Sequence, residues 1–172
     1  MNTRLYILHR FDDYLDNNYQ DATVKSFCGF CNISRTTFYR FFQNMEDLLV
    51  SFYQYKADSI LLNSKDKTYY EVMYIHAELI LKDKYRDMIL NCYKDDPNTF
   101  LRYVSDNFFA FSTKYYYMHN QEKLTNEHLF SLRVYVKGGA YIILEILLDN
   151  TDYQLEDLIT KLNTVKPSFL NI

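Results

Sequence analysis

The chain has 172 residues, of which 48% are hydrophobic and 24% charged, and this globular composition excludes disordered and fibrous proteins. Three Gly and two Pro are too few for the turns of an all-β protein, and a net charge of −3 gives the whole chain no basic character that would attract nucleic acid. The 18 Tyr and 13 Phe predict an interior filled with rings or an aromatic pocket.

No export or membrane segment is expected. The first residues become charged too early for a signal peptide, and the most apolar window, 129–148, contains Arg133, Lys137 and Glu145. Burying those charges in a membrane-spanning helix costs about 2.5 to 3.5 kcal/mol each. We therefore expect a cytoplasmic protein with no membrane partner, and three cysteines that form no structural disulfide framework.

Apolar residues at spacings of three and four predict helices along almost the whole chain. The first helix covers residues 5–15. Thr23 is the expected N-cap of a second helix of about eight residues. Asn32 tolerates the left-handed conformation that closes a helix, and Ser34 can then cap a third helix over residues 35–42.

Six further helices are predicted from the same periodicity. Their approximate ranges are 45–62, 69–81, 85–93, 98–118, 126–148 and 155–165. Asn44 and Thr68 are the expected N-caps of the first two, and Pro97 favours a break before the range 98–118. The fold class is therefore all-α, with about nine helices.

Positive charge gathers on the second and third predicted helices. Residues 22–45 contain Lys25, Arg35 and Arg40 but no Asp or Glu, although 22 of the 172 residues are acidic. Two short helices joined by a tight turn, with polar and cationic residues opening the second, form a unit that enters the major groove of DNA. A solvated helical hairpin is the alternative, because short helix pairs are common.

The same stretch resembles the N-terminal signature of the TetR family of bacterial transcription regulators. The similar segments are residues 23–27, 32–42 and 46–49. The second segment matches the family's Ser-x-x-Thr-aromatic-Tyr-x-x-Phe recognition helix, and the third matches an acidic-Leu-Leu helix start. More weakly, residues 136–150 are similar to the penultimate helix of that family.

The resemblance implies a domain organisation and a function. Residues 1–45 would form a three-helix helix-turn-helix DNA-binding domain, and residues 46–172 a helical regulatory and dimerisation domain. The implied function is that of a homodimeric repressor that binds an inverted repeat in double-stranded DNA and is released by a small-molecule effector. The implied DNA-binding residues are Thr23, Lys25, Ser34, Arg35, Thr36, Thr37, Tyr39 and Arg40.

Individual roles follow from the same resemblance. Arg35 and Thr36 would face bases, and a bidentate contact from Arg35 to guanine is worth about 1 to 3 kcal/mol of discrimination. Thr37 and Tyr39 would hold phosphates, and Arg40 would add a cation nearby.

The chain also departs from the family. Asn32 stands where the family usually has Gly, Met45 where it often has a phosphate-binding Lys, and Phe41 where it has His or Tyr. The alternative function is therefore a protein of this fold that has lost strong DNA binding and acts through a protein partner.

Motifs for other chemistry are weak. Cys28 and Cys31 have the C-x-x-C spacing of redox proteins, but they fall in the DNA-binding unit and are interpreted as core residues, with redox sensing or a zinc site as alternatives. No phosphate loop, zinc-protease motif or nucleophile elbow is present, so we expect no enzyme, cofactor or metal. His76 and His119 are expected to be solvated rather than catalytic.

Two further sets of residues have candidate roles in the regulatory domain. Aromatic side chains at helical spacing are either core or the lining of an effector pocket, and the candidates for the pocket are Tyr70, Tyr74, Tyr93, Phe108, Phe111 and Tyr115, with Tyr69 beside them. Apolar and small residues on the eighth helix are expected to form a two-fold dimer interface, and they are Leu129, Leu132, Val136, Gly138, Gly139, Ile143, Ile146 and Leu147.

Overall fold

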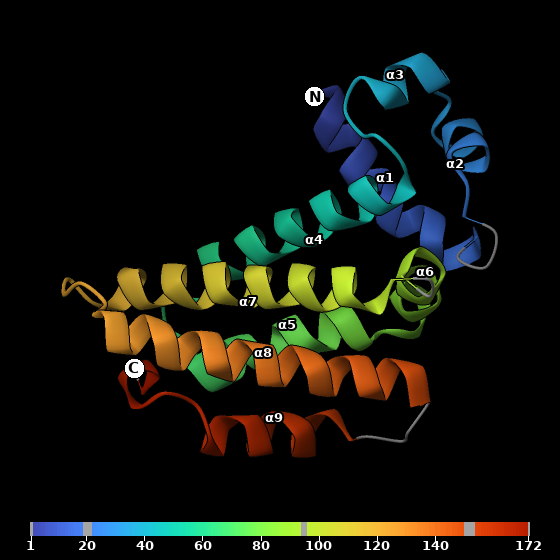
Figure 1. Cartoon of the computed structure of the whole chain (residues 1–172). Coiled ribbons are helices and arrows are strands. Elements are labelled where there is room, and N and C mark those ends of the chain that lie inside the picture. The colour runs from blue at the N-terminus through green and yellow to red at the C-terminus, as the bar shows by residue number, and fades with distance from the viewer. Residues whose placement is uncertain (1, 19–21, 94–95, 150–153, 172) are drawn as a thin grey trace. The chain divides into compact units, whose positions relative to one another are not determined.

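The computed structural model describes residues 2–18, 22–93, 96–149 and 154–171. Across these residues it contains nine α-helices, one 3₁₀ turn and no strand, which confirms the predicted all-α class (Figure 1). The elements are α1 (Thr3–Asn18), α2 (Val24–Cys31), α3 (Arg35–Tyr39), α4 (Met45–Leu62), α5 (Tyr69–Leu81), α6 (Asp83–Tyr93), α7 (Pro97–His119), α8 (Asn126–Asp149), α9 (Leu155–Thr164) and η2 (Ser168–Leu170).

Side-chain caps begin the helices where the sequence predicts them. The Thr23 hydroxyl accepts a hydrogen bond from the backbone N–H of Ser26 at 3.2 Å, and the Ser34 hydroxyl accepts one from Thr37 at 3.0 Å. The Asn44 side-chain oxygen accepts the N–H of Asp47 at 2.8 Å. Each such cap contributes about 1 kcal/mol to helix stability.

The turn between α2 and α3 has the backbone predicted for it. Asn32 has φ 51° and ψ 47°, and it is the only residue with a positive φ in the part of the chain that the structure describes. The N–H groups of Asn32 and Ile33 donate to the carbonyls of Gly29 and Cys28. Helix α3 ends at Tyr39, three residues earlier than predicted, although the N–H groups of the next residues still bond to its carbonyls as a turn.

The chain forms two compact units. The N-terminal unit comprises residues 1–56 and 82–92, and therefore contains α1, α2, α3, most of α4 and nearly all of α6. The C-terminal unit comprises residues 57–81 and 93–172 and contains the end of α4 together with α5, α7, α8 and α9.

Four phenylalanine rings form the centre of the N-terminal unit. Phe11, Phe27, Phe38 and Phe52 come from four different helices, and all are fully buried. The ring centroid of Phe27 lies 5.8 Å from that of Phe11 and 6.1 Å from that of Phe38. The centroids of Phe11 and Phe52 are 5.3 Å apart, and all three pairs are edge-to-face. Aromatic pairs prefer this geometry, so the packing of Phe38 against these rings holds α3 in a defined position.

A charged cluster joins three helices of the same unit. The carboxylate of Asp12 on α1 lies 2.8 Å from the Nζ of Lys56 on α4 and 2.6 Å from the Nζ of Lys84 on α6. It also accepts a hydrogen bond from the Tyr85 hydroxyl, and Lys84 forms a second ion pair with Asp16. Burial by itself would raise the pKa of Asp12, but these donors outweigh burial and hold that pKa well below its ordinary value.

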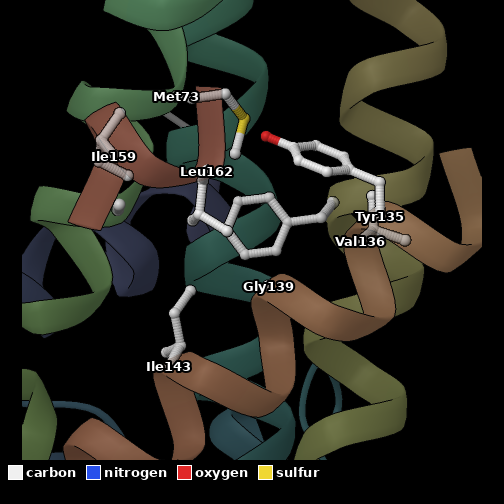
Figure 2. Close-up of a pocket in the computed structure, with 9 residues that line it drawn as sticks. Met73, Tyr135, Val136, Gly139, Ile143, Ile159 and Leu162 are labelled. Carbon is white, nitrogen blue, oxygen red and sulfur yellow. The ribbon is translucent and has the colours of Figure 1, made fainter. Parts of the chain in front are cut away.

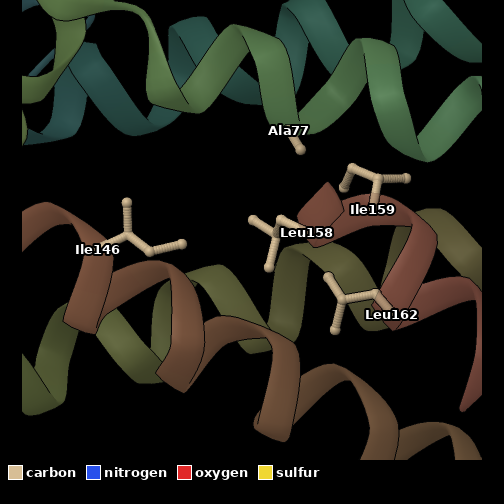
Figure 3. Close-up of a cluster of buried hydrophobic side chains, with 5 residues drawn as sticks. All are labelled: Ala77, Ile146, Leu158, Ile159 and Leu162. Atoms are coloured by element: carbon tan, nitrogen blue, oxygen red, sulfur yellow. The ribbon is translucent and has the colours of Figure 1, made fainter. Parts of the chain in front are cut away.

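In the C-terminal unit, α7 packs along α8, and α9 packs on α5 (Figure 1). The buried side chains where α9 meets its neighbours include Ala77, Ile146, Leu158, Ile159 and Leu162 (Figure 3). Among the described residues, no helix is both long enough and apolar enough to cross a bilayer.

Candidate nucleic-acid interface

Helices α2 and α3 present a polar, positively charged surface. Lys25, Arg35, Thr36 and Arg40 are exposed, and so is Tyr39, whose side chain is 54% accessible. Phe38, the residue before Tyr39, is fully buried against Phe27. One face of the short helix α3 therefore packs on the aromatic core, and the opposite face is exposed to solvent.

The three cations on this surface are free. Within the described residues, neither Lys25, Arg35 nor Arg40 has an ion pair or a hydrogen bond from its side chain to another residue. By contrast, Arg10 pairs with Asp13 at 2.8 Å and lies over the ring of Phe30. The positive charge of α2 and α3 is therefore available to an external anion.

Three of the predicted DNA-binding hydroxyls already form hydrogen bonds at the N-termini of α2 and α3. Thr23 exchanges hydrogen bonds with Ser26 as a capping box, and the hydroxyl oxygens of Ser34 and Thr37 lie 2.9 Å apart. The half-buried Thr37 is therefore partly engaged before any ligand arrives. These side chains shape the turn that presents the cations.

Gly29 is a feature of this surface that the sequence analysis missed. It lies within α2, one turn after Lys25, and an added Cβ would meet no atom within 4 Å. Glycine inside a helix costs about 0.5 to 1 kcal/mol relative to alanine, and no contact within the chain requires it here. A glycine in the middle of a short predicted helix was the available sequence signal.

Two of the three departures from the family, Met45 and Phe41, place apolar side chains at this unit. Met45 is 8% exposed and belongs to the buried core, while Phe41 is half-buried with its ring 6.5 Å from that of Phe42. Neither residue presents a polar group to the outer face, so two positions that hold phosphate in the resembled family are apolar here.

The thiols of α2 are core groups. Cys28 and Cys31 are both buried and form no disulfide. Burial raises the pKa of both thiols, that of Cys31 to about 12, which opposes formation of the reactive thiolate. No cluster of three or more metal-ligating side chains occurs among the residues described.

The candidate effector residues are mostly core side chains. Tyr93, Phe108, Phe111 and Tyr115 are buried, as is Tyr69, whose hydroxyl lies 2.7 Å from the buried hydroxyl of Ser112. Tyr70 and Tyr74 are half-buried and pack against the cluster around α9.

A small apolar pocket lies in the C-terminal unit among α5, α7, α8 and α9 (Figure 2). Of the six candidate residues only Phe108 lines it, and the other lining residues are Met73, Ala77, Tyr135, Val136, Gly139, Ile143, Ile159 and Leu162. About 20 Å³ is open to water-sized groups, which is room for about one water molecule. An organic effector would have to widen it.

His76 corrects an expectation, because it is buried rather than solvated. Its ring packs 4.8 Å from Phe108 and 4.6 Å from Phe111, and its Nδ1 has no hydrogen-bond partner among the described residues. Burial lowers its pKa to about 4, so the imidazole is neutral at pH 7. The nearby carboxylate of Glu78 is exposed, on another side of α5 from the buried His76.

The α8 residues expected at a dimer interface lie mainly inside their own unit. Leu132, Val136, Ile143, Ile146 and Leu147 are buried, because α7 and α9 cover this side of the helix. Leu129 and Gly139 are half-buried, and only Gly138 is exposed. The five buried side chains are therefore largely covered by helices of their own unit.

No protein-family model and no curated protein sequence matches the chain. Solved structures similar to it include two regulators. The dihydroxyacetone kinase operon activator DhaS matches with a TM-score of 0.65 and 19% identity over 95% of this chain and 94% of that chain. The fatty acid degradation regulator FadR from Bacillus halodurans matches with a TM-score of 0.51 and 15% identity over 96% of this chain and 94% of that chain. The chain therefore shares its fold with these two proteins.

Proposed function

We propose that this chain is a TetR-type transcription regulator that binds double-stranded DNA through α2 and α3. The observation that carries the proposal is a surface with three exposed cations, Lys25, Arg35 and Arg40, none of which has an ion pair among the described residues, while the buried Phe38 anchors the other side of α3. A rigid short helix with free cations fits the major groove, where such helices contact base edges. The fold shared with two transcription regulators is consistent with this function.

The residues divide into two tasks. Arg35 and Thr36 open α3, the position from which a recognition helix reads base edges, and Arg35 can donate two hydrogen bonds to guanine. Lys25, Tyr39 and Arg40 suit phosphates, which position the protein without reading sequence.

Dimerisation and repression complete the proposal. A dimer offers two copies of α3 to an inverted repeat, with half-sites about 34 to 36 Å apart or a multiple of that distance. An effector acts by stabilising one of two conformations, and a ligand that must widen the pocket near Phe108 meets that requirement, because it binds only the widened state. Repression, with release by such an effector, is the mode of action we propose.

The second candidate function is a regulator of the same fold that binds a protein instead of DNA. The buried Met45 and the half-buried Phe41 favour it, since apolar side chains at these two positions remove two phosphate anchors.

Selection of duplex fragments by the purified protein at 50 mM salt separates the two candidates. We expect enrichment of an inverted repeat. With Lys25, Arg35 and Arg40 in each subunit, a dimer neutralises about six phosphates, so the log–log salt slope should be about −5. Arg40→Ala should weaken binding to every sequence, whereas the matched control Lys123→Ala, an exposed cation of the C-terminal unit, should not. Folded protein that enriches no duplex would favour the protein-binding alternative.

A further inference from the structure

The side chain of Arg4, in the first turn of α1, carries a positive charge that the chain does not neutralise. It is exposed, and among the described residues it forms neither an ion pair nor a side-chain hydrogen bond. Arg10, six residues further along α1, is by contrast paired with Asp13 at 2.8 Å. The charge of Arg4 is therefore available to an external anion, as are the three cations of α2 and α3.

A buried aromatic ring determines where this charge lies. The guanidinium of Arg4 lies over the ring of Phe42, 5.6 Å from its centroid. Phe42 is 1% exposed, its ring packs 5.7 Å from that of Phe38, and its N–H donates to the Phe38 carbonyl. Phe42 therefore belongs to the turn that continues α3. Arg4 lies beside this turn, and Figure 1 shows the start of α1 close to it.

The stability of α1 does not explain an arginine at this position. A cation in the first turn of a helix meets the positive end of the helix dipole, which disfavours it. The described first turn of α1 contains no acidic residue that would offset this effect. The benefit of the charge therefore comes from a contact outside α1.

The segment that joins α3 to α4 has no cation of its own. Residues 41–47 contain neither Lys nor Arg, and the side chains of Phe41 and Met45 are apolar. A phosphate that lies against this segment can be neutralised only by a cation from elsewhere in the protein. Arg4, held over Phe42, supplies a cation at this place.

The end of α3 is the part of the helix that would lie nearer the sugar–phosphate backbone. In a helix-turn-helix complex the N-terminal residues of the recognition helix contact base edges. The major groove is about 12 Å wide and has a phosphate strand on each side, so a cation beside the other end of the helix suits a phosphate rather than a base.

We propose that Arg4 of each subunit binds a backbone phosphate of the duplex beside the end of α3, and that Phe42 holds its guanidinium in position for this contact. The inference rests on the proposed DNA-binding function and adds a contact from α1, outside α2 and α3. A dimer then neutralises about eight phosphates instead of about six, so the log–log salt slope steepens from about −5 to about −7.

Salt titration of duplex binding tests the contact. Arg4→Ala should return the slope to about −5 and raise Kd at least about tenfold at 100 mM salt, because a dimer loses two phosphate contacts. Arg4→Lys keeps the charge and should retain a slope of about −7. Circular dichroism and urea unfolding show that both variants are folded.

Lys82→Ala is the matched control. Lys82 is an exposed cation of the same unit and has no ion pair among the described residues. It lies two residues before Lys84, which pairs with Asp16. Asp16 is twelve residues, or about 18 Å, along α1 from Arg4. Lys82→Ala therefore removes the same charge at the other end of α1 and should keep the wild-type slope.

Uncharged backbone analogues locate the phosphate. Single phosphates of the selected duplex are replaced in turn by methylphosphonates. In each half-site, one replacement should weaken binding of the wild type but leave binding of Arg4→Ala unchanged. General attraction between the protein and DNA would not produce a loss confined to one position.

The outcomes separate this contact from the proposed function. Duplex binding in which Arg4→Ala has the wild-type slope, or the wild-type response to every methylphosphonate, overturns the Arg4 contact and leaves the DNA-binding function intact. A loss in Arg4→Ala that Arg4→Lys does not restore also contradicts a contact made through charge. Folded wild-type protein that enriches no duplex overturns both proposals.

Discussion

The ammonium of Lys84 lies 2.6 Å from the carboxylate of Asp12, and this ion pair holds α6 to α1 within the N-terminal unit. The side chains of Lys84 and Asp12 are 23% and 27% accessible. The Asp12 carboxylate also accepts hydrogen bonds from Lys56 and Tyr85, so it binds donors from two other helices at once. The loss of this carboxylate should therefore be felt beyond a single surface pair.

Asp12→Asn should lower the free energy of unfolding by about 1 to 3 kcal/mol at pH 7, because Lys56 and Tyr85 lose their carboxylate and Lys84 keeps only its ion pair with Asp16. The folded-state pKa of Asp12 lies below its ordinary value, so its contribution is complete above about pH 3.9, the unfolded pKa, and is lost as pH falls through the folded pKa. Urea unfolding of both proteins at pH 7 and pH 3 measures the difference, which should shrink in acid. A difference that stays constant or grows in acid would contradict this assignment.

Ser112→Ala should destabilise the C-terminal unit by about 1 to 3 kcal/mol, because it removes a hydrogen-bond partner from the fully buried hydroxyl of Tyr69. The double variant Tyr69→Phe/Ser112→Ala removes both partners and should be more stable than Ser112→Ala alone. Thermal unfolding of these two variants and of Tyr69→Phe provides the comparison, and strictly additive losses would show that the two hydroxyls do not interact.

Gly29→Ala should stabilise the protein by about 0.5 to 1 kcal/mol, because the added methyl meets no neighbour and alanine favours a helix. If α2 approaches the DNA backbone closely, the same change should weaken duplex binding for every sequence. Chemical unfolding and fluorescence anisotropy measure the two effects. Tighter or unchanged duplex binding would show that Gly29 does not lie in the interface.

Arg35→Ala and Arg40→Ala should differ in kind. The first should cost about 1 to 3 kcal/mol and relax the preference at one base position. The second should weaken binding to all sequences alike and lower the steepness of the log–log salt slope by about two, because a dimer loses two phosphate contacts. Selection of bound fragments with each variant, followed by salt titration, distinguishes them. Equal effects on sequence preference would show that α3 is placed in the groove differently from our proposal.

Cys28 and Cys31 should react slowly with thiol reagents at pH 8 in the folded protein and quickly after unfolding, because burial raises the pKa of both thiols and hides them. Labelling followed by mass spectrometry gives the rates. Rapid labelling in the folded state would revive the redox interpretation of the C-x-x-C spacing.

Local structure was largely determined by the sequence alone. Thr23, Ser34 and Asn44 cap the helices that follow them, and Asn32 adopts the left-handed conformation expected of it. These features depend on residues within a few positions of one another, so a short stretch of sequence is enough to predict them. Helical periodicity likewise located the nine helices of the described residues to within a few positions, with α3 shorter than expected.

Which helix face is covered was decided by the tertiary structure. Apolar residues occupy two sides of α8, and only the packing of α7 and α9 shows that Leu132 and Ile143 are interior while Val134 and Tyr141 remain exposed. His76 is polar by type, yet two rings from α7 enclose it. Periodicity reports that a face is apolar but not what covers it, because that depends on contacts between residues far apart in the chain.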